Sequence, residues 1–153
     1  MKVLLIEDEL DDQKTYKRLI EDACSGGAEV HTARDSLCVD EKLGKITPDL
    51  VVVDIWLGGM TQGAHGIEII EQMRKKSEYK KLKIFALTVA VSDKVKDKAT
   101  NAGCDKFFRK MEDDKKFINA VRRFHSTFQR KQLSTVKPNK SPNYPVSRGR
   151  KQG

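Results

Sequence analysis

Cysteine, proline and long apolar runs are scarce in this 153-residue chain, and each scarcity excludes a class of protein. The three cysteines, Cys24, Cys38 and Cys104, are widely spaced and odd in number, which argues against a disulfide framework and indicates a reducing compartment. No pair of cysteines or histidines has the spacing of a zinc finger. No apolar run approaches the ~20 residues of a membrane span, and no signal peptide precedes the first apolar segment. We therefore expect a cytoplasmic protein.

Acidic residues are absent from the end of the chain. Seven of the 30 Lys and Arg follow Gln129, so the remaining 23 nearly balance the 22 Asp and Glu, and the net charge of +8 belongs to the tail. Three of the four prolines also lie there, among Ser, Asn, Gly and Lys. Such a composition cannot bury enough surface to fold alone. We predict one domain over residues 1–130 and a basic, disordered tail over residues 131–153. The tail holds no recognisable DNA-binding module, so a nucleic-acid partner is not expected.

Apolar, β-branched runs alternate with amphipathic segments along the rest of the chain. The pattern predicts strands over residues 3–6, 28–32, 50–54, 83–87 and 105–109, and helices over residues 11–24, 36–43, 66–76, 92–102 and 112–128. Five successive βα units favour parallel strands joined by right-handed crossovers. The run 50–53 is apolar at every position, which is typical of a strand buried on both faces.

Polar side chains stand where four of these strands end. Glu7 and Asp8 follow the first strand, Asp54 ends the third, Thr88 follows the fourth and Lys110 follows the fifth. The carboxyl ends of parallel strands share one edge of a sheet, where α/β proteins place their sites. Three carboxylates at one edge repel each other, and Mg²⁺ with its oxygen ligands removes that conflict. Such a site suits a phosphoryl group, which Asp54 could accept as a nucleophile while Thr88 and Lys110 stabilise its oxygens.

These residues, in this order, closely resemble the receiver domain of bacterial two-component response regulators (CheY-like) over about residues 2–128. The resemblance implies a flavodoxin-like (βα)5 fold, a doubly wound parallel sheet with strand order 2-1-3-4-5. It also implies that Asp54 is the phosphoacceptor. The implied ligands of Mg²⁺ (or Mn²⁺) are Glu7, Asp8, Asp54 and the main-chain carbonyl of Trp56, and Thr88 and Lys110 are the implied phosphoryl-stabilising residues.

The resemblance further implies a signalling cycle. A sensor histidine kinase or a phosphotransfer protein would phosphorylate Asp54, as in a phosphorelay. Thr88 and Phe107 would then act as switch residues that shift a pre-existing equilibrium. A downstream protein would read the surface of the fourth helix, fifth strand and fifth helix. We expect a stand-alone receiver and no enzyme activity beyond Mg-dependent self-phosphorylation and self-dephosphorylation.

Several positions depart from the family pattern. Trp56 and Ala90 place apolar groups where the family often has polar side chains that orient the hydrolytic water, and Val89 stands where the family prefers a smaller residue. We therefore hypothesise slow self-dephosphorylation of Asp54. Met111 follows Lys110 where the family usually has proline, which leaves open whether that peptide is cis or trans. Residues 61–64 form an insertion that either contacts a partner or is simply a tolerated surface loop.

Two other functions compete with the phosphorylation switch. A receiver-like module could bind protein partners without phosphorylation, and Met111 and the insertion keep that alternative open. A haloacid-dehalogenase-like phosphatase also uses an aspartate nucleophile at a strand end, but it needs a second acid where this chain has Trp56. The acids Asp11 and Asp12 at the start of the first helix either border a kinase-docking surface or are simply exposed.

Overall fold

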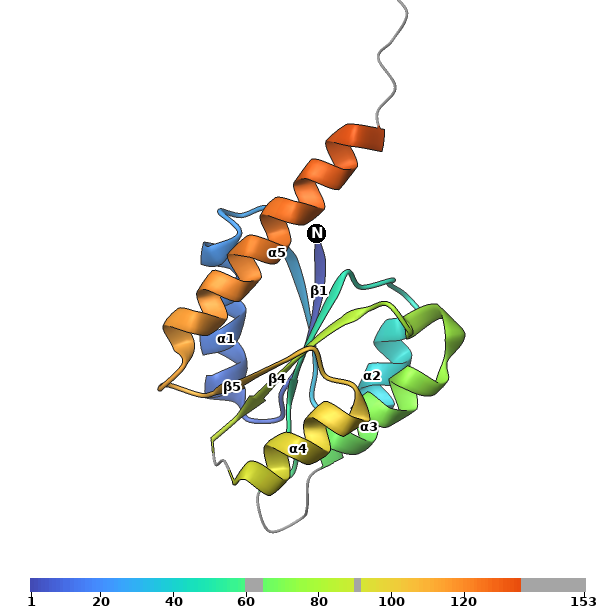
Figure 1. Cartoon of the computed structure of the whole chain (residues 1–153), viewed down its shortest axis with the longest axis vertical. Coiled ribbons are helices and arrows are strands. Elements are labelled where there is room, and N and C mark those ends of the chain that lie inside the picture. The colour runs from blue at the N-terminus through green and yellow to red at the C-terminus, as the bar shows by residue number, and fades with distance from the viewer. Residues whose placement is uncertain (60–64, 90–91, 136–153) are drawn as a thin grey trace, which may run out of the picture.

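Five parallel strands, in the order β2-β1-β3-β4-β5, form the central sheet of the protein (Figure 1). The computed structural model describes residues 1–59, 65–89 and 92–135. In chain order the elements are β1 (Lys2–Ile6), α1 (Leu10–Ala23), β2 (Glu29–Ala33), α2 (Ser36–Leu43), β3 (Leu50–Asp54), α3 (His65–Lys75), the 3-10 turn η1 (Ser77–Tyr79), β4 (Lys83–Thr88), α4 (Asp93–Ala102), β5 (Lys106–Arg109) and α5 (Asp114–Thr135). The predicted flavodoxin-like fold and strand order are confirmed.

The central strand β3 is buried on both faces, as its unbroken apolar sequence predicts. Val51 and Val53 pack into the core on one side of the sheet, whereas Leu50 and Val52 pack into the core on the other. Successive side chains of a strand point to opposite faces, so a strand covered on both sides needs an apolar residue at every position. Asp54 is the one carboxylate in this strand, and it stands at the end of the apolar run.

Helices cover both faces of the sheet. Figure 1 shows α1 and α5 together on one side and α2, α3 and α4 on the other. On the α1–α5 side, the rings of Tyr16, Phe108 and Phe117 make edge-to-face contacts with centroids 5.5–5.7 Å apart. These contacts join α1, β5 and α5 in one core.

Capping residues define where several helices begin and end. The carboxylate of Asp35 accepts a hydrogen bond of 2.8 Å from the backbone N–H of Cys38 and so caps α2. Ser92 caps α4 in the same way. Gly103 ends α4 with a φ of 107°, in the left-handed region that favours glycine.

The last helix is longer than its sequence pattern predicted. α5 continues to Thr135, so the predicted boundary between domain and tail after residue 130 falls inside a helix. The reason is local: residues 131–135 contain neither glycine nor proline, and Lys131, Gln132 and Leu133 are good helix formers. This last part is exposed and adds nothing to the core.

Three predicted features lie outside the described residues. They are the 61–64 insertion, Ala90, and the tail from residue 136 onward. Within the residues that are described, no helix combines the length and the apolar character needed to cross a membrane.

Candidate functional site

The predicted site residues meet at one edge of the sheet. Asp54 and Thr88 end β3 and β4, while Glu7 and Lys110 follow β1 and β5 directly. The strand ends are tied to each other, since the backbone N–H of Lys110 donates to the carbonyl of Thr88 at 2.7 Å and that of Ile55 donates to a β4 carbonyl at 2.9 Å. Glu7, Asp54, Thr88 and Lys110 are all buried. The sequence pattern therefore identified groups that the fold places together.

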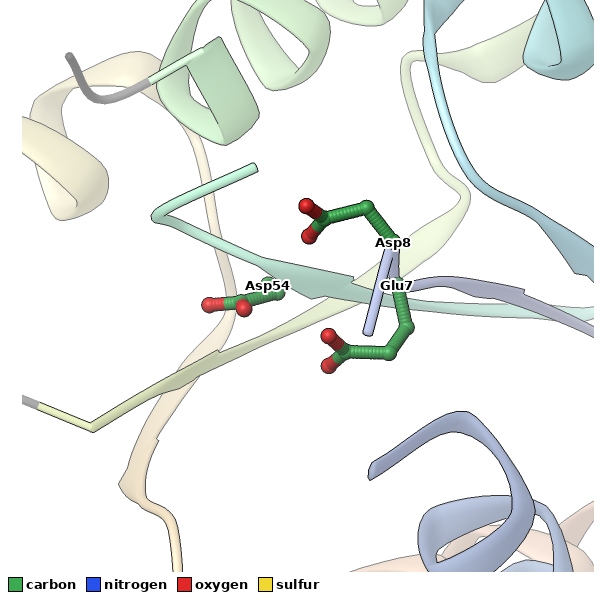
Figure 2. Close-up of side chains that lie close together, drawn as sticks. All are labelled: Glu7, Asp8 and Asp54. Carbon is green, nitrogen blue, oxygen red and sulfur yellow. The ribbon is translucent and has the colours of Figure 1, made fainter. Parts of the chain in front are cut away.

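Three carboxylates surround a common space at the ends of β1 and β3. Glu7, Asp8 and Asp54 each offer one oxygen within 4.8 Å of the others, and Figure 2 shows the three side chains side by side. Backbone N–H groups orient them: that of Gly58 donates to Asp8 at 2.9 Å, and that of Trp56 donates to Asp54 at 3.1 Å. The loop after β3 thus fixes two of the three acids.

Lys110 supplies the positive charge of the site. Its Nζ lies 2.6 Å from Glu7 Oε2, 3.0 Å from Asp54 Oδ2 and 2.7 Å from Asp12 Oδ2. Burial alone would lower the pKa of Lys110, but the charge of Asp54 and the bonds to Asp12 and Glu7 outweigh it and raise the pKa above its ordinary value. Lys110 is therefore a fixed ammonium ion that partly neutralises the acids.

Burial and the neighbouring carboxylate of Asp54 disfavour the charged form of Glu7. Burial, and then the nearby charge of Asp54, raise the pKa of Glu7 to about 7, although its bond to Lys110 acts in the opposite direction. A second cation beside Lys110 would stabilise the charged form of Glu7 and reduce its repulsion with Asp54. Clustered carboxylate oxygens are the ligands that Mg²⁺ and Mn²⁺ prefer. The residues present fit a hard divalent cation, with Glu7, Asp8 and Asp54 as the side chains able to hold it.

Gly66 supports the site from the first turn of α3. A Cβ at this position would meet the Asp54 carbonyl oxygen at 2.0 Å, and the N–H of Gly66 donates to the carbonyl of Ile55 at 3.1 Å. Only a residue without a side chain allows α3 to start this close to the end of β3. The sequence pattern predicts a helix that starts at Gly66 but does not indicate this contact.

Two residues of α1 contact the Lys110 turn and were not predicted as site residues. Asp12 binds the Lys110 ammonium, and the hydroxyl of Tyr16 accepts a hydrogen bond of 3.2 Å from the N–H of Met111. Asp12 appeared in the sequence only as an acid at a helix start. Its contact to Lys110 depends on how α1 packs against the turn before α5, 98 positions further along the chain, and no local pattern indicates it.

The remaining predicted residues differ in how far they are buried. Phe107 is half-buried against the core on the α2–α4 side, Trp56 is half-buried, and Val89 is 47% exposed. The peptide between Lys110 and Met111 is trans, as are all others among residues 1–59, 65–89 and 92–135, and Met111 has a φ of 65°. This resolves the question that the missing proline raised.

A comparison with protein families decides what kind of domain this is. The model of the response regulator receiver domain matches residues 3–122. The chain belongs to this family. Receiver domains are components of two-component signalling systems, so the expectation drawn from the resemblance is confirmed at this level.

Solved receiver structures share the fold. The chemotaxis response regulator CheY4 of Vibrio cholerae is 28% identical with a TM-score of 0.64, covering 78% of this chain and 97% of its own. The receiver domain of sensor histidine kinase PA1611 from Pseudomonas aeruginosa PAO1, solved with a magnesium ion coordinated in its active site cleft, is 17% identical with a TM-score of 0.66 and covers 82% and 97%. The Mn²⁺-bound form of response regulator Rcp1 is 19% identical with a TM-score of 0.61 and covers 89% and 96%.

Proposed function

We propose that this receiver is a phosphorylation switch whose acceptor is Asp54. One observation carries the proposal: the Asp54 carboxylate contacts a buried ammonium group 3.0 Å away and is clustered with two further carboxylates that suit a divalent cation. A carboxylate at a strand end is common, but one that contacts a fixed positive charge and also belongs to a cluster able to hold a cation is suited to phosphoryl transfer.

The chemistry follows from these groups. An oxygen of Asp54 attacks the phosphorus of the donor, an oxygen–phosphorus bond forms, and the bond from phosphorus to the leaving group breaks. The leaving group, an imidazole nitrogen of a phosphohistidine or the acetate of acetyl phosphate, takes the electron pair. Lys110 faces the phosphoryl oxygens as a point charge, and Thr88 stands one strand away as a hydrogen-bond donor. Charge neutralisation at those oxygens is what Mg²⁺ or Mn²⁺ supplies when it is bound.

The magnesium of the Pseudomonas receiver and the manganese of Rcp1 support a divalent cation as the cofactor here. We propose that Glu7, Asp8, Asp54 and the main-chain carbonyl of Trp56 hold it. A histidine kinase or a phosphotransfer protein is the proposed phosphoryl donor. The proposed output is contact with another protein through α4, β5 and α5, controlled by Thr88 and Phe107. Under this proposal the domain catalyses only its own phosphorylation and dephosphorylation.

Intact-mass measurement after incubation with acetyl phosphate and Mg²⁺ tests the proposal. Wild type should gain a single phosphoryl group, Asp54→Ala should gain none, and chelation of the metal should prevent the gain. Asp49→Ala is the matched control, since Asp49 precedes the same strand and should leave the adduct unchanged. A wild type that gains no phosphoryl group would instead support a protein-binding module that works without phosphorylation.

A further inference from the structure

Asp12 is a partner of Lys110 that stands apart from the three clustered acids. Its Oδ2 lies 2.7 Å from the Lys110 Nζ. The corresponding distances are 2.6 Å for Glu7 and 3.0 Å for Asp54. Glu7, Asp8 and Asp54 form a cluster in which each residue offers one oxygen within 4.8 Å of the others. Asp12 is not a member of this cluster. The ammonium group therefore joins the acceptor site to a carboxylate on α1.

The same face of α1 also holds the turn that carries Lys110. Tyr16 lies one helical turn after Asp12, and its ring centroid is 5.8 Å from the Lys110 Nζ. The Tyr16 hydroxyl accepts from the N–H of Met111 at 3.2 Å and donates to the carboxylate of Asp114 at 2.8 Å. Lys110 is thus held at its ammonium group by Asp12 and at its backbone through the next residue by Tyr16.

Burial makes the contact to Asp12 strong. The Lys110 side chain is 3% exposed, and that of Asp12 is 38% exposed. A pair with one deeply buried member is screened less by solvent than an ion pair between two exposed side chains, which contributes little. Asp11 offers the contrast, because it precedes Asp12 in the same helix, is 92% exposed and pairs with an exposed lysine.

An ammonium group has three N–H donors, and three carboxylates contact that of Lys110. A phosphoryl group on Asp54 must recruit the same ammonium. We propose that Asp12 is a positioning residue that competes with the phosphoryl group for Lys110 and thereby weakens the binding of phosphoryl-like anions at Asp54. The inference rests on the proposed function and adds to it a residue of α1 that limits how strongly the site holds its ligand.

Two physical effects act in the same direction. The Asp12 carboxylate holds the ammonium on the α1 side, so shifting it toward a phosphoryl group on Asp54 breaks a short charge-assisted hydrogen bond. The negative charge of Asp12 also repels a dianionic group at Asp54, because both carboxylates contact the same nitrogen atom. Removing this one charge should therefore tighten the site for an anion.

Beryllofluoride, an anion that mimics a phosphoryl group on a carboxylate, provides the test. Fluorine-19 NMR titration in Mg²⁺ measures how much of it each full-length variant binds. Asp12→Asn should bind it about three- to tenfold more tightly than wild type, the range expected for one partly screened charge. Asp11→Asn makes the same change in net charge at an exposed position and should match wild type. Asp12→Glu restores the charge and should return the affinity toward the wild-type value.

The outcomes separate the inference from the proposed function. If Asp12→Asn binds with wild-type or weaker affinity, or if Asp11→Asn tightens binding equally, Asp12 does not compete for Lys110 and the inference is wrong. If wild type itself binds no beryllofluoride in Mg²⁺, and gains no phosphoryl group from acetyl phosphate, the proposed function fails and the inference fails with it.

Discussion

The Nζ of Lys110 lies 3.0 Å from Oδ2 of Asp54, although 56 positions separate the two residues in the chain. Both side chains are buried, and Lys110 is the cation that offsets the carboxylates of Asp54 and Glu7. Removing one partner of a buried ion pair leaves an uncompensated charge, which costs more than the pair contributes. This relationship makes Lys110 important for stability as well as for the proposed phosphoryl transfer.

The first prediction concerns that charge. Lys110→Ala should lower the free energy of unfolding in the absence of metal by about 3 kcal/mol, as measured by urea denaturation, and it should slow phosphorylation by acetyl phosphate. Mg²⁺ should recover more stability in this variant than in wild type, because a cation can replace the lost ammonium. Lys106→Ala, at the exposed first position of β5, the strand that precedes Lys110, is the control. Equal losses in both variants would mean that the Lys110 charge has no special role.

The second prediction is a dependence of stability on pH. Burial and Asp54 raise the pKa of Glu7 to about 7, above its ordinary value of 4.5. Between these values the folded protein keeps a proton that the unfolded chain releases, so stability should fall as the pH rises from about 5 to 8.

Urea denaturation in chelator, at pH 5 and pH 8, measures this effect. Glu7→Gln should remove on the order of 2 kcal/mol of the loss seen in wild type. Glu71→Gln, on the exposed surface of α3, should leave the loss unchanged. Parallel pH profiles for wild type and Glu7→Gln would show that Glu7 is not the group responsible.

The third prediction concerns Gly66. A methyl group there meets the Asp54 carbonyl oxygen at 2.0 Å, so either α3 or the end of β3 has to move. Gly66→Ala should lower the free energy of unfolding by about 2–3 kcal/mol and reduce the phosphoryl adduct on Asp54. Gly44→Ala is the matched control, because its added methyl group meets no atom closer than 3.5 Å. Unfolding curves that coincide for the two variants would contradict the contact.

The fourth prediction concerns Arg74, which ties α3 to the turn between α4 and β5. Its guanidinium donates to the carbonyls of Tyr79 and Leu82 at 2.7 and 2.8 Å and to that of Gly103 at 2.8 Å. Lysine cannot reach three carbonyls in this planar arrangement, so Arg74→Lys should cost about 2–3 kcal/mol of unfolding free energy. Arg123→Lys, on the exposed face of α5, should cost nothing measurable. A wild-type unfolding curve for Arg74→Lys would refute this role.

The fifth prediction concerns the lifetime of the proposed acyl phosphate. Trp56 is half-buried beside Asp54 and donates its backbone N–H to that carboxylate. A polar side chain at this position should orient water toward the phosphorus, so Trp56→Asn should shorten the lifetime of the phosphorylated protein severalfold. Following the adduct by intact mass after removal of acetyl phosphate measures the decay. An unchanged decay rate would remove Trp56 from the residues that control the lifetime.

Much of the site could be predicted because each part has a local signal. Asp54 and Lys110 each follow directly on an apolar strand, and parallel strands bring such residues to one edge. Asp12 and Tyr16 had no such signal. Their contacts to Lys110 and Met111 span more than 90 positions and depend on how α1 packs against the turn before α5, which no local pattern encodes.

Element ends were predicted less well than element types. The helix α5 passes the expected boundary at residue 130 because a charged, exposed segment without glycine or proline can continue a helix that the core has already started. The close approach of Gly66 to Asp54 likewise depends on the angle at which α3 meets the sheet. A glycine at a helix start does not reveal that angle.

The most direct test of the account is to locate the phosphoryl group on one residue. Borohydride reduces an acyl phosphate to an alcohol, so treatment of the phosphorylated protein should convert Asp54, and no other acid, to homoserine. Peptide mass spectrometry then identifies the modified position. Homoserine at position 54, and none in protein that has not met acetyl phosphate, is the predicted result. Modification at Glu7 or Asp8 with Asp54 intact, or no modification in Mg²⁺, would contradict the central claim.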